Sequence, residues 1–207
     1  MPELGSTPSP RQIELLERAY AYALRHGLAG LSLRPLAAAI GSSPRVLLFL
    51  FGSKDGLVRA LLARARVDEL ALLEELQADN RRPGPALGIV AERVWGWLAE
   101  PSHRPLLTLW VEGYARSLVD PGGPWAGFAR ATVEDWLRVL AVAQHPERRD
   151  TLAGQAQRSL VLAVLRGALL DLLATGDVDR TTAAVHQQLT ALAPSASGAA
   201  AAAVRSS

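Results

Sequence analysis

Histidine and cysteine are the residues whose spacing most often reveals catalytic or metal chemistry, and here neither forms such a pattern. The histidines, His26, His103, His145 and His186, are scattered, and there is no cysteine. The sequence also lacks a His-Glu-x-x-His motif, a Gly-x-Ser-x-Gly elbow and a Gly-rich phosphate loop. Without cysteine, a disulfide, a thiolate metal site and a cysteine nucleophile are excluded, and a reducing cytoplasm is the expected location. We expect no enzyme, no bound metal and no cofactor.

The basic residues suggest a different chemistry, because they are unevenly distributed along the chain. Residues 1–60 carry seven basic and four acidic side chains, a net charge of +3. The other 147 residues carry 15 basic and 16 acidic side chains, a net charge of −1. A polyanion would therefore meet the N-terminal third first, although a solvated basic surface is the alternative interpretation.

The elements that must position these residues are predicted to be helices. Apolar residues recur at helical spacing almost everywhere, and strand-like alternation is not found. We expect an all-α fold with helices over residues 10–26, 33–40, 44–51, 54–80, 86–99, 106–119, 125–143, 149–175 and 179–193. No apolar run reaches about 18 residues and the N-terminus does not resemble a signal peptide, so we expect no membrane association.

The two short helices predicted over 33–40 and 44–51 have the dimensions of a helix-turn-helix. Gly41, Ser42 and Ser43 join them, and Pro44 opens the second helix. Such a turn sets the helices at a steep angle, so that the second can enter a DNA major groove about 12 Å wide. A tight helical corner without a role in nucleic-acid binding would have the same spacing.

A family resemblance favours the first interpretation. Residues 13–27 (IELLERAYAYALRHG), 31–41 (LSLRPLAAAIG) and 51–57 (FGSKDGL) resemble the N-terminal DNA-binding domain of the TetR family of transcriptional regulators. The resemblance implies a homodimer that binds a pseudo-palindromic DNA operator, typically as a repressor, and releases it when a small molecule binds the C-terminal domain. The implied organisation is a DNA-binding domain over 9–56, a ligand-binding and dimerisation bundle over 57–193, and a disordered tail over 194–207.

The resemblance also implies roles for particular residues. Ser32 and Arg34 match phosphate-contacting positions, Ser43 and Arg45 match the start of the recognition helix, and Lys54 matches a lysine that contacts the DNA backbone. Physical chemistry agrees, because a helix N-terminus offers free N–H groups and a partial positive charge to a phosphate.

The recognition helix departs from the family pattern because it is strongly apolar. Leu48 stands where the family usually has tyrosine, and Leu50 stands where it often has histidine or tyrosine. The run from Val46 to Phe51 is too long for every side chain to point inward, so we expect some of Val46, Leu48 and Phe49 to face outward. Contacts with thymine methyl groups are one use for them, and a partner interface is another. A helical module that binds a small molecule or a protein, with a decayed DNA face, is therefore the alternative function.

The C-terminal part is rich in large aromatic residues, since all five tryptophans lie beyond residue 60. Such residues fill cores, and they also line largely apolar pockets that hold a few polar groups. Arg166 interrupts the apolar run from Leu160 to Leu173, where a charge needs a partner. The candidate ligand-binding residues, for a small and largely apolar ligand, are Trp95, His103, Trp110, Glu112, Tyr114, Phe128, Trp136 and Arg166.

The last two predicted helices are suited to dimerisation. Residues 158–174 are almost continuously apolar, with small residues Ala163, Gly167 and Ala168 that permit close approach of another helix. A helix that is apolar all round must be buried, within the protomer or against a second copy. The family resemblance favours a two-fold, four-helix interface built from these two helices.

Overall fold

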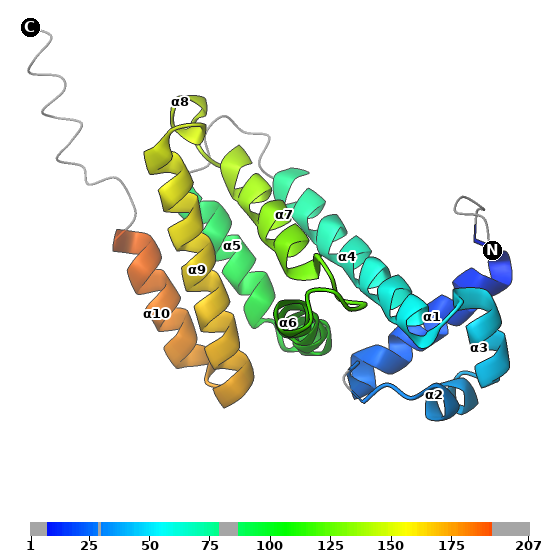
Figure 1. Ribbon diagram of the computed structural model, residues 1–207. Coiled ribbons are helices and arrows are strands. Elements are labelled where there is room, and N and C mark those ends of the chain that lie inside the picture. The colour runs from blue at the N-terminus through cyan, green and yellow to red at the C-terminus, as the bar shows by residue number, and fades with distance from the viewer. Residues whose placement is uncertain (1–7, 29, 79–86, 192–207) are drawn as a thin grey trace, which may run out of the picture. The chain divides into compact units, whose positions relative to one another are not determined.

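The structure is a computed structural model that describes residues 8–28, 30–78 and 87–191, the side chains of 72–78 excepted. Its described elements are helical, as expected, and follow one another along the chain as Figure 1 shows. They are α1 (Pro10–His26), α2 (Leu33–Ala39), α3 (Pro44–Phe51), α4 (Lys54–Ala78), α5 (Leu87–Ala99), the 3₁₀ helix η1 (Pro101–His103), α6 (Arg104–Val119), α7 (Phe128–Val142), α8 (Pro146–Arg149), α9 (Leu152–Thr175) and α10 (Val178–Ala191). The predicted tail over 194–207 lies outside the described residues.

Local sequence signals explain where the first helices begin. Ser9 precedes Pro10, and its Oγ accepts a hydrogen bond from the N–H of Gln12 at 3.2 Å. Ser43 and Ser53 cap α3 and α4 in the same way, accepting from Val46 N and Gly56 N. A serine at this position satisfies one of the N–H groups that a helix leaves unpaired at its start.

Three helix starts differ from the prediction by two or more residues. Helix α6 begins at Arg104 rather than 106, because Pro105 is tolerated in a first helical turn. Helix α7 begins at Phe128 rather than 125, because Gly127 has a φ of 76°, which is not helical. The short helix α8 was not predicted, and α9 begins at Leu152 rather than 149, where Thr151 Oγ1 caps Gly154 N at 3.0 Å.

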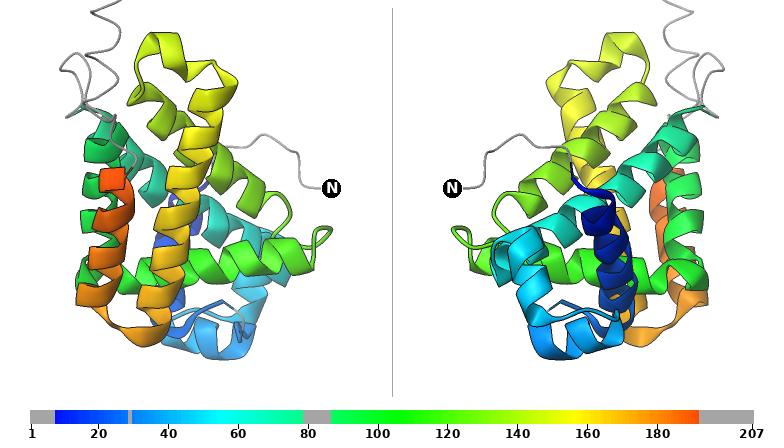
Figure 2. Two further views of the ribbon diagram at one scale, coloured as in Figure 1. Left: turned by 90° about the vertical axis from the view of Figure 1, so that its left-hand side faces the viewer. Right: turned by 90° about the vertical axis from the view of Figure 1, so that its right-hand side faces the viewer.

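Contacts divide the chain into two compact units. The first comprises Met1–Glu74 and Pro101–Asp135, and the second comprises Glu75–Glu100 and Trp136–Ser207. In the first unit α1 contacts α2 and α6, and α2 contacts α3. In the second unit α5, α9 and α10 contact one another in pairs, and the left view of Figure 2 shows α9 and α10 side by side.

Ion pairs and hydrogen bonds tie α1 to α4 within the first unit. The hydroxyl of Tyr20 donates to Asp68 Oδ2 at 2.8 Å, and Arg64 Nε donates to Glu17 Oε1 at 2.7 Å. Arg64 also bonds Asp68 and lies over the Tyr20 ring at 4.9 Å from its centroid. Burial and the bond to Asp68 raise the pKa of Tyr20, so this hydroxyl remains a donor to a more alkaline pH than that of an exposed tyrosine.

Within the described residues, no single helix is both long and apolar enough to cross a membrane, although α2 and α3 pass that test of length and composition as one pair bent by 102°.

Candidate nucleic-acid interface

Helices α2 and α3 form a helix-turn-helix. They are bent by 102° relative to each other, and the turn between them consists of residues 40–43. DNA-binding helix-turn-helix motifs have angles of about 90–120° and turns of three to four residues. Gly41 has a φ of 67° in this turn, a left-handed conformation that glycine adopts without the steric cost of a side chain.

Helix α1 forms hydrogen bonds with the C-terminal ends of both helices of the motif. Arg18 Nη1 donates to the carbonyl oxygen of Ile40 at 3.3 Å, at the end of α2. Gln12 Nε2 donates to the carbonyl oxygen of Leu50 at 3.1 Å, in the last turn of α3. Leu36 and Leu47 are 0% and 1% exposed, and they anchor the inner faces of α2 and α3. One face of α3 is therefore fixed inward, and the other is presented outward.

The side chains predicted to contact DNA lie on the surface. Ser32, Arg34, Ser43, Arg45 and Lys54 are all exposed. Arg34, Arg45 and Lys54 have no ion-pair partner among the residues that the structure describes. Arg45 and Lys54 lie in the first turns of α3 and α4, where the helix dipole adds positive potential.

The two serines of the set differ in their bonding. Ser43 Oγ accepts from Val46 N at 3.3 Å and so caps α3, whereas Ser32 stands at the N-cap position of α2 without a side-chain bond to the helix. Ser32 therefore occupies a cap position that serine favours, and its side chain does not cap α2. Its hydroxyl remains available for another partner, such as a phosphate oxygen.

This difference gives a first prediction. Ser43→Ala should lower the free energy of unfolding by about 1 kcal/mol, the usual cost of losing an N-cap. Ser32→Ala is the matched control and should change it by less than about 0.5 kcal/mol. Urea unfolding at one fixed protein concentration measures both, and equal losses for the two variants would contradict the capping assignment.

The outward face of α3 is apolar, as the sequence predicted. Phe49 is 85% exposed, Leu48 is 41% exposed and Val46 is 38% exposed, while Leu47 between them is buried. Arg45 is the cation that this face offers beside them.

Comparisons with known proteins bear on this arrangement. No protein-family model matches the sequence, and no curated protein matches it either. Solved structures do match, among them a Rhodococcus sp. protein assigned to the TetR-family transcriptional regulators, with 16% identity, a TM-score of 0.68, and coverage of 89% of this chain and 99% of that one. A TetR transcription regulator from Haloarcula marismortui matches with 17% identity, a TM-score of 0.64, and coverage of 88% and 96%.

This chain has the TetR fold. The family resemblance carried by residues 13–57 is thus confirmed at the level of the fold. Another similar structure is that of the multidrug binding protein EbrR in complex with imidazole. It shares 25% identity with this chain, with a TM-score of 0.65 and coverage of 94% of this chain and 98% of that one.

The candidate ligand-binding residues of this TetR fold are distributed over both units. Trp95, Trp136 and Arg166 belong to the second unit, and the other five belong to the first. Trp95 is 2% exposed, and its Nε1 donates to Thr182 Oγ1 at 2.9 Å, so it ties α5 to α10. Trp110, Phe128 and Trp136 are also buried, while His103, Glu112, Tyr114 and Arg166 are half-buried. Their role in ligand binding stays a prediction.

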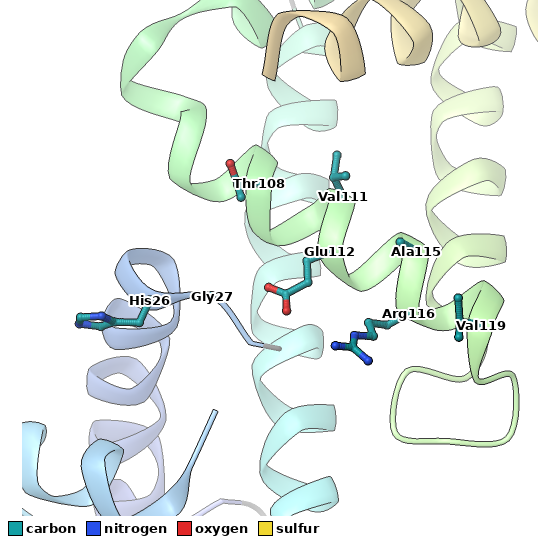
Figure 3. A pocket seen from close by; sticks show the side chains of 8 residues that line it. All are labelled: His26, Gly27, Thr108, Val111, Glu112, Ala115, Arg116 and Val119. Carbon is teal, nitrogen blue, oxygen red and sulfur yellow. The ribbon is translucent and has the colours of Figure 1, made fainter. Parts of the chain in front are cut away.

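A pocket of about 530 Å³ lies between the end of α1 and one face of α6 in the first unit (Figure 3). Its lining comprises His26, Gly27, Thr108, Val111, Glu112, Ala115, Arg116 and Val119. Among the eight candidates, all within the described part of the chain, Glu112 lines this pocket. Figure 3 shows Glu112 and Arg116 projecting toward the end of α1, while the His26 ring points away from Glu112.

Glu112 also bonds the segment that joins α1 to α2. Its Oε2 accepts a hydrogen bond at 2.8 Å from the backbone N–H of Leu28, a residue that is 2% exposed. Gly27 has a φ of 74°, and a Cβ there would lie 3.2 Å from the same oxygen. The sequence suggested Glu112 only as a ligand contact. Its bond to a residue 84 positions away has no local sequence signal.

A second prediction concerns this bond. Glu112→Ala should lower the free energy of unfolding by about 1.5–3 kcal/mol, because it removes a charged acceptor and leaves a buried N–H unpaired. Glu112→Gln keeps an acceptor oxygen and should lose less. Arg116→Ala, on the next turn of the same pocket wall, is the control and should change stability by less than about 0.5 kcal/mol. Urea unfolding compares the three variants, and a loss in Arg116→Ala as large as in Glu112→Ala would contradict the assignment.

Among the described residues, no group of three His, Asp or Glu side chains lies close enough to hold a metal ion.

Proposed function

We propose that the chain is a TetR-family transcriptional regulator that binds a pseudo-palindromic operator as a homodimer, represses transcription, and releases DNA when a small, largely apolar ligand binds. The observation that carries this proposal is the helix-turn-helix, with its 102° bend, its four-residue turn and its exposed cations at two helix starts. The proposed organisation keeps residues 9–56 as the DNA-binding domain and 57–193 as the ligand-binding and dimerisation domain.

DNA binding is supported by the position of the positive charge. Arg45 and Lys54 lie in the first turns of two successive helices, and both side chains are free to reach a polyanion. Contacts with phosphates position a protein on the duplex, and contacts with base edges specify the sequence. We assign Arg34 and Lys54 to phosphates, and Arg45 to a base edge.

Dimerisation is supported by a line of exposed residues on α9, which we call the α9 stripe. Its members recur at alternating spacings of three and four and are small or aliphatic: Ala153, Ala156, Leu160, Ala163, Gly167, Leu170 and Ala174. That is the heptad spacing of helices that pack against each other at close range. Figure 2 shows α9 and α10 side by side, so the stripe and the neighbouring face of α10 would pair with their copies around a two-fold axis.

The ligand response is proposed to reach the DNA-binding helices through α4 and α6. Helix α4 follows α3 after two residues, and Glu112 of α6 accepts a hydrogen bond from Leu28, in the segment that joins α1 to α2. A ligand that favours one position of these helices would change the distance between the two helix-turn-helix motifs of the dimer. The size of this change is limited by the difference between the ligand's affinities for the DNA-binding and the released conformations.

Selection of bound sequences from random double-stranded DNA tests the proposal. The purified dimer should enrich a pseudo-palindrome with half-sites about one helical turn, roughly 34 Å, apart. Binding should weaken steeply with salt, because the Lys and Arg side chains that contact the phosphates release counterions into the solution. If no sequence is enriched and no salt-dependent binding is seen, the proposal is wrong. Mass spectrometry of the purified protein would reveal a small molecule that copurifies with it.

A further inference from the structure

The outer face of α3 combines one guanidinium with three apolar side chains. Phe49 is 85% exposed, which is unusual for an aromatic side chain, and Leu48 and Val46 are exposed beside it. Phe49 in particular contributes little to the interior of the protomer, where Leu47 fills the inward position of α3. The exposed apolar face therefore needs an explanation outside the folded protomer.

The charge around this face indicates its partner. Arg34, Arg45, Lys54 and Arg59 are exposed on α2, α3 and α4, and have no ion-pair partner within the described part of the chain. An apolar patch on a motif that carries four exposed cations, against the one acid Asp55 in the first turn of α4, complements an apolar group that is itself bordered by anions. Duplex DNA has that combination, since phosphates border each groove and thymine carries a methyl group in the major groove.

The chemistry of the side chains restricts what they can read. Leucine, valine and phenylalanine cannot donate or accept a hydrogen bond, so they cannot distinguish the polar edges of bases. The C5-methyl group of thymine is the apolar feature of the major groove, and Phe is among the side chains that contact it. Arg45 can bond the O6 and N7 atoms of guanine with two parallel hydrogen bonds.

Helical spacing places these contacts close together. Arg45, Leu48 and Phe49 lie at positions i, i+3 and i+4, on one face of α3. At 1.5 Å per residue, Arg45 and Phe49 are offset by about 6 Å along the helix axis. Successive base pairs rise by about 3.4 Å, so the two side chains would meet bases roughly two steps apart.

We propose that α3 reads thymine by its methyl group. Each half-site would place thymines opposite Phe49 and Leu48, and a guanine opposite Arg45 within about two base pairs of them. This inference rests on the proposed function, because it describes how the same surface recognises its operator.

Replacing thymine by deoxyuridine tests the inference, because the two bases differ only in the methyl group. The sites enriched from random DNA are synthesised with deoxyuridine at one thymine position at a time, and the dissociation constant is measured by fluorescence anisotropy at fixed salt. We expect affinity to fall about fourfold for each contacted methyl group, and about fifteenfold when both half-sites are changed. Thymines in the flanking DNA serve as the control and should tolerate the change.

Phe49→Ala and Leu48→Ala connect the effect to α3. Because Phe49 is so exposed, Phe49→Ala should fold with an unchanged thermal unfolding midpoint. Its affinity for the thymine site should fall to that of the wild-type protein for the deoxyuridine site, and it should no longer distinguish the two bases at that position.

Three results would overturn the inference. If deoxyuridine sites bind as tightly as thymine sites while binding stays sequence-specific and salt-dependent, methyl readout is wrong and the proposed function stands. If Phe49→Ala leaves DNA binding unchanged but abolishes a protein contact, the apolar face serves a protein partner. If the wild-type protein binds no DNA, both the inference and the proposed function fail.

Discussion

Gly167→Arg is expected to convert the proposed homodimer into a monomer while each protomer stays folded. Gly167 lies near the middle of the α9 stripe, and a Cβ added there meets no atom within 4 Å inside the protomer. The substitution should even favour the helix, since arginine has a better helix propensity than glycine by roughly 0.5–1 kcal/mol. In the dimer, however, the long charged side chain would enter a seam of small residues and lose its water.

Loss of the dimer should reduce DNA binding strongly. Two linked helix-turn-helix motifs bind DNA about 10²–10⁴-fold more tightly than one, because the second motif binds at a high effective concentration once the first is bound. Gly167→Arg should lose this factor although the substitution lies outside the helix-turn-helix. Light scattering measures the mass, anisotropy measures the affinity, and circular dichroism checks the helix content.

Gly96→Arg is the matched control for this experiment. Gly96 lies on α5 in the same unit, is also exposed, and also has no atom within 4 Å of an added Cβ. This variant gains the same charge and a similar helix propensity, so it should remain dimeric and bind DNA normally. A dimeric Gly167→Arg, or a Gly96→Arg that is equally monomeric, would remove the α9 stripe from the proposed interface.

The helix starts show which parts of a fold can be predicted from sequence. Ser9, Ser43 and Ser53 each bond an N–H three residues later, so the signal and the structure it determines lie within one turn. The start of α7 depends instead on Gly127, whose φ is 76°. The spacing of apolar residues does not indicate this backbone conformation. Glycine adopts left-handed and right-handed backbones with similar ease, so its conformation depends on its surroundings.

The candidate site shows the same division between local and distant information. The outward position of Val46, Leu48 and Phe49 could be predicted, because a helix of this length has too little inward surface for six apolar side chains. The hydrogen bonds from Gln12 to Leu50 and from Leu28 to Glu112 could not be predicted. They join residues 38 and 84 positions apart, and such pairings are decided by tertiary packing.

Tryptophan residues illustrate why composition alone did not locate a ligand. Trp95 was predicted as a pocket residue, and its indole N–H is bonded to Thr182 of α10. Buried tryptophan usually finds such a partner whether it lines a pocket or fills a core. The number and spacing of aromatic residues therefore indicate a large apolar interior without showing which part of it is open to a ligand.

Arg45→Ala and Lys54→Ala are expected to weaken DNA binding in two different ways. Lys54 is assigned to a phosphate, so Lys54→Ala should weaken binding to every sequence by a similar factor. It should also reduce the slope of log affinity against log salt by about 1 for each protomer, or about 2 for the dimer. Arg45 is assigned to a guanine edge, so Arg45→Ala should cost about 1–3 kcal/mol per half-site and relax specificity at one base pair.

Affinities measured between about 50 and 200 mM salt, on the selected operator and on variants of each base pair, separate these effects. Arg148→Ala controls for net charge, because Arg148 is exposed on α8 and belongs to the second unit. It should leave both the salt slope and the base preference unchanged. If Arg45→Ala and Lys54→Ala both weaken all sequences equally, Arg45 contacts a phosphate, and sequence discrimination must come from the apolar side chains of α3. If neither variant differs from Arg148→Ala, the helix-turn-helix does not bind DNA through these helix starts.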